Sequence, residues 1–299
     1  MRRTMLYLPG NNPNMLMRGY LFRPDGLILD LEDSVTASEK DAARILVREV
    51  LANREFGECE VTVRINGVDT ELWRDDISSV VPAGAAGIRV PKVDTPRTVL
   101  DIDEELSEVE SRSGIPQGST KIFCLLESAL GVWNAYDIAT SSKRVAAIIP
   151  GGEDLAADLR ANRSADGVEL EWVRRMMIVA ARAAGVDALD TVYPRITDDD
   201  GLRREAEFTK KLGFDGKSVI HPGQIQIIHE VYTPTEREVE SAKRIVAAAR
   251  EAASRGRGAV TVDGRMVDLP VVRRAEFTLT RAGIAFGEPE ETPDGERRG

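Results

Sequence analysis

Eight short apolar runs recur along most of this chain, separated by segments of helical length. Most of the runs are apolar or β-branched at nearly every position, as expected for parallel strands that are buried on both faces. Eight strand–helix units in a chain of 299 residues favour an α/β fold, a closed (β/α)8 TIM barrel, over an open sheet. The expected strands are residues 4–9, 26–31, 60–65, 87–91, 121–126, 145–150, 189–193 and 217–220.

Residues at the expected helix boundaries support this alternation. Segment 38–52 places apolar residues at helical spacing, and Ser38 is expected to cap it. Gly185 directly follows segment 170–184, where a glycine commonly ends a helix. Asn12, which is followed by a proline, is typical of a helix start, and a capping role is favoured for it.

The pattern changes after the eighth run. Residues 1–234 are expected to form the catalytic barrel, and residues 235–286 an appendage of a helix, a hairpin and a second helix. Thr235 is the expected cap of the first helix, and the Asp-Gly pair at 263–264 is the expected hairpin turn. The appendage is too small to be an independent domain, so it must pack on the barrel or on a neighbouring subunit. Residues 287–299, rich in Glu, Pro, Gly and Arg, are expected to be disordered.

Charge and composition argue against several kinds of partner. A formal charge of −10 and a pI near 5.0 disfavour nucleic acids and anionic membrane surfaces. An anionic substrate would therefore need a local basic site. No run approaches the roughly 18 apolar residues of a membrane span, and no signal peptide is recognised, so a cytoplasmic protein is expected. Cys59 and Cys124 lack a metal-binding spacing and are interpreted as reduced structural thiols.

Three charged residues close or follow expected strands: Arg64, Glu127 and Asp154. The ends of parallel barrel strands meet at one face, so these side chains should lie near one another. Two carboxylates without histidine or cysteine suit Mg²⁺ or Mn²⁺ rather than Zn²⁺, and they leave room for substrate oxygens and water. Arg64 suits bidentate binding of a substrate carboxylate; the alternative is an ion pair within the barrel, for example to Glu32.

The acidic run 30–33 and Lys92 each allow two interpretations. The run could be a loop that caps the next helix, or its carboxylates, with Glu32 and Asp33 as candidates, could surround a metal and its waters. Lys92, at the end of the fourth expected strand, could neutralise acidic neighbours or contact the substrate.

Main-chain groups and one histidine complete the candidates. Gly151 and Gly152 let backbone N–H groups approach a ligand oxygen, so Gly152 and Glu153 are candidate substrate-binding residues. His221 follows the eighth expected strand and should face the mouth, where both a structural and a functional role stay open.

At these residues the chain resembles the HpcH/HpaI-type aldolase and citrate lyase family, which includes citrate lyase β chains and the citramalyl-, malyl- and citryl-CoA lyases. The similarity extends over nearly the whole sequence. The matching segments are residues 8–11, 30–35, 64–67, 91–93, 127–128, 151–155, 213–217, 221–222 and 264–270.

The resemblance implies a role for each candidate residue. Glu127 and Asp154 would hold Mg²⁺, and Arg64 would bind a substrate carboxylate. Asp268 would be an acid/base supplied by the appendage of an adjacent subunit, which would make that appendage a lid. The residues implied near the thioester arm are Tyr7, Arg18, Ile220 and His221.

The resemblance also implies a reaction. We expect a Mg²⁺-dependent carbon–carbon lyase that cleaves a citryl thioester to oxaloacetate and an acetyl thioester. The alternatives are a free-standing citramalyl-, malyl- or citryl-CoA lyase, or a non-catalytic assembly subunit. Some CoA-using relatives carry lysine where this chain has Asn14, which favours an acyl-carrier-protein thioester over free CoA. Expected partners are further copies of the chain, as a trimer or dimer of trimers, and citrate lyase α and acyl-carrier subunits.

Overall fold

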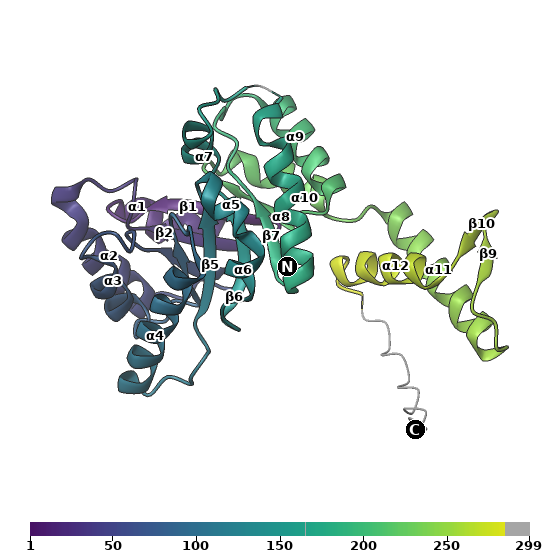
Figure 1. Ribbon diagram of the computed structural model, residues 1–299, viewed down its shortest axis with the longest axis horizontal. Helices are drawn as coiled ribbons and strands as arrows, with labels where there is room; N and C mark the ends of the chain where they lie inside the picture. The colour runs from purple at the N-terminus through teal and green to yellow at the C-terminus, as the bar shows by residue number, and fades with distance from the viewer. Residues whose placement is uncertain (165, 285–299) are drawn as a thin grey trace. The chain divides into compact units, whose positions relative to one another are not determined.

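The computed structural model describes residues 1–164 and 166–284. The described chain divides into two compact units, one of residues Met1–Tyr232 and one that begins at Thr233 (Figure 1). The segment 287–299, for which disorder was predicted, lies outside the described residues. No helix in the described part of the chain is long and apolar enough to cross a membrane.

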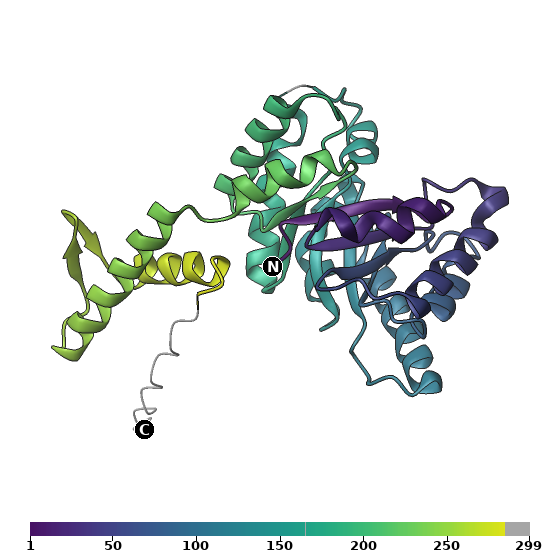
Figure 2. The same ribbon diagram turned by 180° about the vertical axis from the view of Figure 1, so that it is seen from behind.

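The first unit is built on a closed barrel of eight parallel strands that follow one another in chain order (Figures 1 and 2). This confirms the predicted (β/α)8 fold. The strands are β1 Thr4–Pro9, β2 Gly26–Asp30, β3 Glu60–Arg64, β4 Gly87–Val90, β5 Lys121–Leu126, β6 Val145–Pro150, β7 Asp187–Asp190 and β8 Gly216–Val219.

Helical segments separate the strands. They are α1 Pro13–Arg18, η1 Gly19–Phe22, η2 Ala37–Glu39, α2 Lys40–Asn53, α3 Trp73–Val80, α4 Pro96–Ser113, α5 Ala129–Trp133, α6 Ala135–Thr140, α7 Gly152–Asp158, η3 Val168–Leu170, α8 Glu171–Ala184, α9 Asp199–Leu212 and α10 Gly223–Tyr232. The η segments are short 3-10 helices.

Two of the three helix-boundary signals predicted within the barrel are confirmed. The Asn12 side chain accepts from the N–H of Met15 at 3.1 Å, and Gly185 ends α8 with a φ of 73°. The cap predicted at Ser38 is wrong, because this residue lies within η2 and α2 begins only at Lys40 without a side-chain cap. Its hydroxyl lies instead 3.4 Å from that of Thr36.

Alternation along the strands determines which side chains enter the barrel. Phe123 and Leu125 of β5 belong to a small interior cluster with Met5, Ile28, Ala147, Ile149 and Leu189. The residues that alternate with them, Ile122, Cys124 and Leu126, belong to the larger core that includes the surrounding helices. Because successive residues of a strand point to opposite faces, Glu127 continues the inward-facing series at the end of β5.

The second unit contains α11 Glu236–Ser254, β9 Val260–Val262, β10 Arg265–Val267 and α12 Leu269–Arg281. Thr235 and Glu238 form a reciprocal capping box at the start of α11. The hairpin turns at Asp263 and Gly264, whose φ angles of 49° and 76° suit a two-residue turn. The predicted helix, hairpin and second helix are therefore present.

Candidate active site

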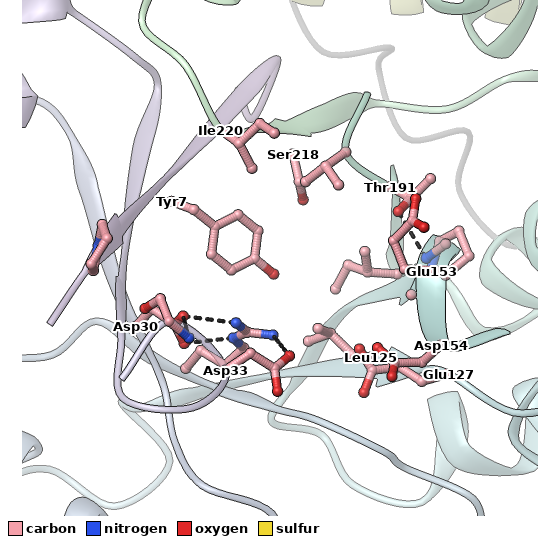
Figure 3. Close-up of a pocket in the computed structure, with 18 of the residues that line it drawn as sticks. Tyr7, Asp30, Asp33, Leu125, Glu127, Glu153, Asp154, Thr191, Ser218 and Ile220 are labelled. Carbon is pink, nitrogen blue, oxygen red and sulfur yellow. Dashed lines mark hydrogen bonds and ion pairs between the residues drawn. The ribbon is translucent and has the colours of Figure 1, made fainter. Parts of the chain in front are cut away.

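A cavity of about 450 Å³ lies at the carboxyl ends of the barrel strands (Figure 3). In barrels of this type the functional site lies at this face. The structure brings Arg64, Glu127 and Asp154 together there, as predicted. The residues that line it include Tyr7, Asp30, Asp33, Arg64, Glu127, Gly151, Gly152, Glu153, Asp154, Thr191, Ser218 and Ile220.

The Arg64 guanidinium is held by three carboxylates at the end of β2. Its Nε and Nη2 donate to the two Asp30 oxygens at 2.6 and 2.7 Å. Its Nη1 lies 2.7 Å from Glu32 Oε2 and 3.1 Å from Asp33 Oδ2. Asp30 and Arg64 are register partners on adjacent strands, so their side chains emerge on the same side. The ion pair to Glu32, the alternative interpretation of Arg64, is therefore present.

The acidic run folds around the Asp30 carboxylate. Burial opposes its ionisation, but the hydrogen bonds and charge of Arg64 hold the pKa of Asp30 below its usual value. The same carboxylate accepts from the N–H groups of Glu32 at 3.0 Å and Ser34 at 3.2 Å. Lys40 Nζ, from the first turn of α2, donates to two main-chain carbonyls of the run at 2.7 and 2.6 Å. Asp30 thus orients Arg64, a role that the sequence did not assign.

Glu127 is 6% exposed and faces the cavity. Its Oε2 accepts from the N–H of Lys92 at 2.9 Å. Burial, followed by repulsion from Glu32 and Asp154, raises the pKa of Glu127 to about 7. The Lys92 ammonium lies 3.3 Å from Glu32 Oε1, so the neutralising role considered for this lysine is observed.

The segment from Gly151 to Asp154 approaches Glu127 closely. A Cβ on Gly151 would lie 2.3 Å from Glu127 Cγ, so no larger residue fits without a shift. The N–H of Gly152 donates to Thr191 Oγ1 at 2.9 Å. It is therefore not a free donor for a substrate, contrary to the prediction. Glu153 and Asp154 lie in the first turn of α7, whose N–H groups have no intrahelical acceptor.

The residues present fit a hard divalent cation. Figure 3 shows the Glu127 and Asp154 carboxylates close together on one side of the cavity. Within the described residues, no group of three or more His, Cys, Asp or Glu side chains could hold a metal ion. A cation here would therefore draw on these two carboxylates, and water and substrate oxygens would complete its coordination. It would also offset the repulsion that opposes ionisation of Glu127.

The predicted thioester-arm residues divide into two pairs. Tyr7 and Ile220 line the cavity, and the Tyr7 ring points into it from the side opposite Glu127 (Figure 3). Arg18 and His221 are exposed and are not among the lining residues. The structure instead gives His221 a local contact, since its Nδ1 accepts from the N–H of Gly223 at 3.2 Å.

Asp268 lies in the second unit. Its side chain accepts from the N–H of Val271 at 3.4 Å and caps α12. This local role explains an aspartate at the position without any catalysis. Its predicted role as an acid in a neighbouring subunit stays a prediction.

Sequence reasoning did not identify Thr191 or Arg89. Thr191 was placed inside an expected strand, but β7 ends at Asp190. The Thr191 hydroxyl therefore lies beyond the strand, where it accepts from the N–H of Gly152. Arg89 is fully buried on β4, and the only sequence signal was a charge inside an apolar run.

Comparison with known proteins places the chain in a family. Residues 3–222 match the family described as HpcH/HpaI aldolase/citrate lyase. A citrate lyase subunit beta of Haemophilus influenzae is 44% identical over 96% of this chain and 99% of its own length. A (3S)-malyl-CoA thioesterase of Cereibacter sphaeroides is 36% identical over 95% of this chain and 96% of its own.

The fold agrees with a solved structure from the same group. The protein CitE of Mycobacterium tuberculosis, in complex with magnesium, acetoacetate and coenzyme A, is 31% identical. The match covers 94% of this chain and 98% of that one, with a TM-score of 0.77. The resemblance inferred from the motifs is thereby confirmed. The chain belongs to the HpcH/HpaI aldolase/citrate lyase family and is a carbon–carbon lyase of the citrate lyase β-subunit type.

Proposed function

We propose that this chain cleaves a citryl thioester to oxaloacetate and an acetyl thioester, with Mg²⁺ bound between Glu127 and Asp154. The observation that carries the proposal is the buried Glu127 carboxylate, which faces the cavity beside Asp154 and accepts a hydrogen bond from the Lys92 N–H. Similarity to citrate lyase β subunits and to a structure that contains magnesium and coenzyme A supports it. Mn²⁺ has the same ligand preferences and could substitute.

The chain's own residues would orient the substrate. Bound Mg²⁺ would supply Lewis-acid stabilisation of charge that develops on the hydroxyl oxygen next to a carboxylate. By holding the cation, Glu127 and Asp154 would determine where in the cavity that charge develops. Arg64 would bind a substrate carboxylate through donor capacity now shared with Asp33. Asp33 is 59% exposed at its side chain and has the longest of the three contacts, so it is the partner easiest to displace. Glu32 would remain near the metal site, held by its ion pairs with Arg64 and Lys92.

Cleavage expels an acetyl-thioester enolate, which must be protonated on carbon. We assign this proton to Asp268 of a neighbouring subunit, because a carboxylic acid is a suitable donor and the resemblance to the family implies an acid/base at this position. The proposal therefore requires a homo-oligomer, a trimer or a dimer of trimers. The second unit would act as a lid in trans.

The thioester arm would pass Tyr7 and Ile220 on the side of the cavity away from Glu127. Arg18 and His221, both exposed, would contact the distal part of the arm. Asn14 favours an acyl-carrier-protein thioester, and hence α and acyl-carrier partner subunits in a cytoplasmic complex. A free-standing citramalyl-, malyl- or citryl-CoA lyase is the second candidate. The 36% identity with a (3S)-malyl-CoA thioesterase supports a CoA thioester as the substrate of this candidate.

The deciding experiment measures oxaloacetate released from citryl-CoA by the purified full chain, with Mg²⁺ and with EDTA. We expect Mg²⁺-dependent release in the native chain and none in Glu127→Gln. Parallel assays with citramalyl-CoA and malyl-CoA report pyruvate and glyoxylate. Faster turnover of either compound than of citryl-CoA would favour the second candidate. Inertness towards all three, with citryl-acyl-carrier protein also uncleaved, would leave a non-catalytic assembly role.

A further inference from the structure

Arg89 lies inside the barrel beneath the cavity. It is 0% exposed, and its Cα is paired in register with Arg64 on one side and Phe123 on the other. Phe123 belongs to the interior cluster, so the Arg89 side chain also enters the barrel. Its guanidinium carbon lies 5.5 Å from the centre of the Tyr7 ring and 5.9 Å from that of Phe123.

No carboxylate among the described residues forms an ion pair with Arg89. Its Nη1 lies 3.5 Å from Ser218 Oγ, at the limit of a hydrogen bond, and its Nε and Nη2 have no hydrogen-bond partner. Burying an unpaired charge costs several kcal/mol even after relaxation. The neighbouring Arg64 adds repulsion. A feature this unfavourable for stability calls for a functional explanation.

A second arginine that is equally buried, Arg174, shows which partners a purely structural site gives to such a side chain. Arg174 is also 0% exposed, but it pairs with Asp190 at 2.9 Å and with Glu205 at 2.9 Å. Arg89 has cation–π contacts in place of such partners. These contacts leave its positive charge uncompensated under the cavity floor.

Two hydroxyl groups connect Arg89 with the cavity. Ser218 and Tyr7 both line it (Figure 3). Arg89 contacts both residues, through Ser218 Oγ and the Tyr7 ring. If Ser218 Oγ accepts from Arg89, its own proton is free to point into the cavity. Arg89 and Arg64 both lie beside the Tyr7 ring, with guanidinium carbons 5.5 and 5.1 Å from the ring centre, and both charges favour an anion near its hydroxyl.

We propose that Arg89 is a positioning residue that makes the Tyr7 and Ser218 hydroxyls a binding site for a substrate carboxylate at the cavity floor. This inference rests on the proposed function and specifies its substrate. The carboxylate beside the hydroxyl would go to the metal side, at Glu127 and Asp154, and would be the one that Arg64 binds. The floor would then bind the carboxymethyl group that distinguishes a citryl thioester from a citramalyl thioester, which has a methyl group there, and from a malyl thioester, which has hydrogen.

The test compares native chain and Arg89→Met for kcat and KM on citryl-CoA and citramalyl-CoA. We expect kcat/KM for citryl-CoA, divided by kcat/KM for citramalyl-CoA, to fall at least about tenfold in the variant. This is the size of one lost charge-assisted contact. Arg89→Lys should recover part of the ratio. Tyr7→Phe and Ser218→Ala, which keep the shape and remove one hydroxyl each, should lower it in the same direction. Arg174→Met is the control for loss of a buried arginine and should not change it.

Binding gives a readout that does not need turnover. Titration calorimetry with oxaloacetate and with pyruvate, each with Mg²⁺, should show a preference for oxaloacetate that falls in Arg89→Met. Thermal unfolding should show no loss of stability in this variant, because an unpaired charge is replaced by an apolar chain of similar length.

The outcomes separate the two proposals. If the native chain cleaves no thioester, the proposed function fails, and the oxaloacetate-to-pyruvate preference still tests Arg89. If both kcat/KM values fall by the same factor in Arg89→Met, or if the binding preference is unchanged, Arg89 only balances the charge of the acidic mouth. Either result overturns the inference.

Discussion

The main-chain N–H of Lys92 donates to Glu127 Oε2 at 2.9 Å, and Lys92 holds a left-handed φ of 52° to do so. This conformation costs a non-glycine residue roughly 1 kcal/mol. The backbone strain therefore coincides with the hydrogen bond that positions the expected metal ligand. The Lys92 ammonium, near Glu32, is a separate contribution.

Glycine and alanine at position 92 should separate these two effects. Lys92→Gly and Lys92→Ala both remove the ammonium, but only glycine accepts the left-handed φ without strain. We expect the free energy of unfolding of Lys92→Gly to exceed that of Lys92→Ala by about 1 kcal/mol. Urea titrations monitored by circular dichroism measure it. Equal stabilities would mean that the backbone at this position is unstrained.

A methyl group at Gly151 should damage the metal site. Its Cβ would lie 2.3 Å from Glu127 Cγ and 2.5 Å from Oε1, so the carboxylate must move. We expect Gly151→Ala to bind Mg²⁺ at least about tenfold more weakly, a loss of 1.4 kcal/mol or more, as measured by calorimetry. Gly258→Ala is the matched control, because a Cβ there meets nothing within 4 Å. Unchanged Mg²⁺ affinity in Gly151→Ala would argue against Glu127 as a ligand.

Glu127 should make the metal-free protein less stable as pH rises. The pKa of Glu127 is raised from 4.5 to about 7, chiefly by burial, so the unfolded chain loses this proton first. Stability should therefore fall between about pH 4.5 and 7, by roughly 3 kcal/mol from this group. Glu127→Gln should lack this part of the decrease, and saturating Mg²⁺ should oppose it in the native chain. Urea unfolding at several pH values, with EDTA or Mg²⁺, tests both statements.

Serine at position 268 should separate catalysis from capping. Asp268→Ser keeps an N-cap for α12, whereas Asp268→Ala removes it at a cost of about 1 kcal/mol. We expect both variants to be inactive, and only the alanine variant to lose stability. Full activity in Asp268→Ser would remove this residue from the mechanism.

Mixed oligomers test whether Asp268 acts in trans. Glu127→Gln and Asp268→Ser chains, each inactive, should regain activity after they are unfolded together and refolded. A mixed oligomer would contain sites with an intact metal pair from one chain and an intact Asp268 from another. Native mass spectrometry would verify mixing. Mixed but inactive oligomers would show that Asp268 does not reach a neighbouring site.

The sequence was sufficient to predict the barrel and the place of its site. Strands buried on both faces are apolar at nearly every position, so they can be recognised without knowing their partners. Parallel strands in a closed barrel end at one face, so Arg64, Glu127 and Asp154 could be grouped from position alone. Caps at Asn12 and Thr235 and the turn at 263–264 depend on neighbours in the chain and were predicted correctly.

Tertiary structure alone decided how these residues are partnered. The pairing of Asp30 with Arg64 depends on the register between β2 and β3. The contact of Gly152 with Thr191 depends on where β7 ends, and the position of Arg89 depends on which face of β4 points inward. These contacts join residues distant in the chain, and the low dielectric of the interior determines their energies. Local sequence therefore specifies which groups reach the mouth of the barrel, and packing between strands decides which of them remain free to bind a substrate.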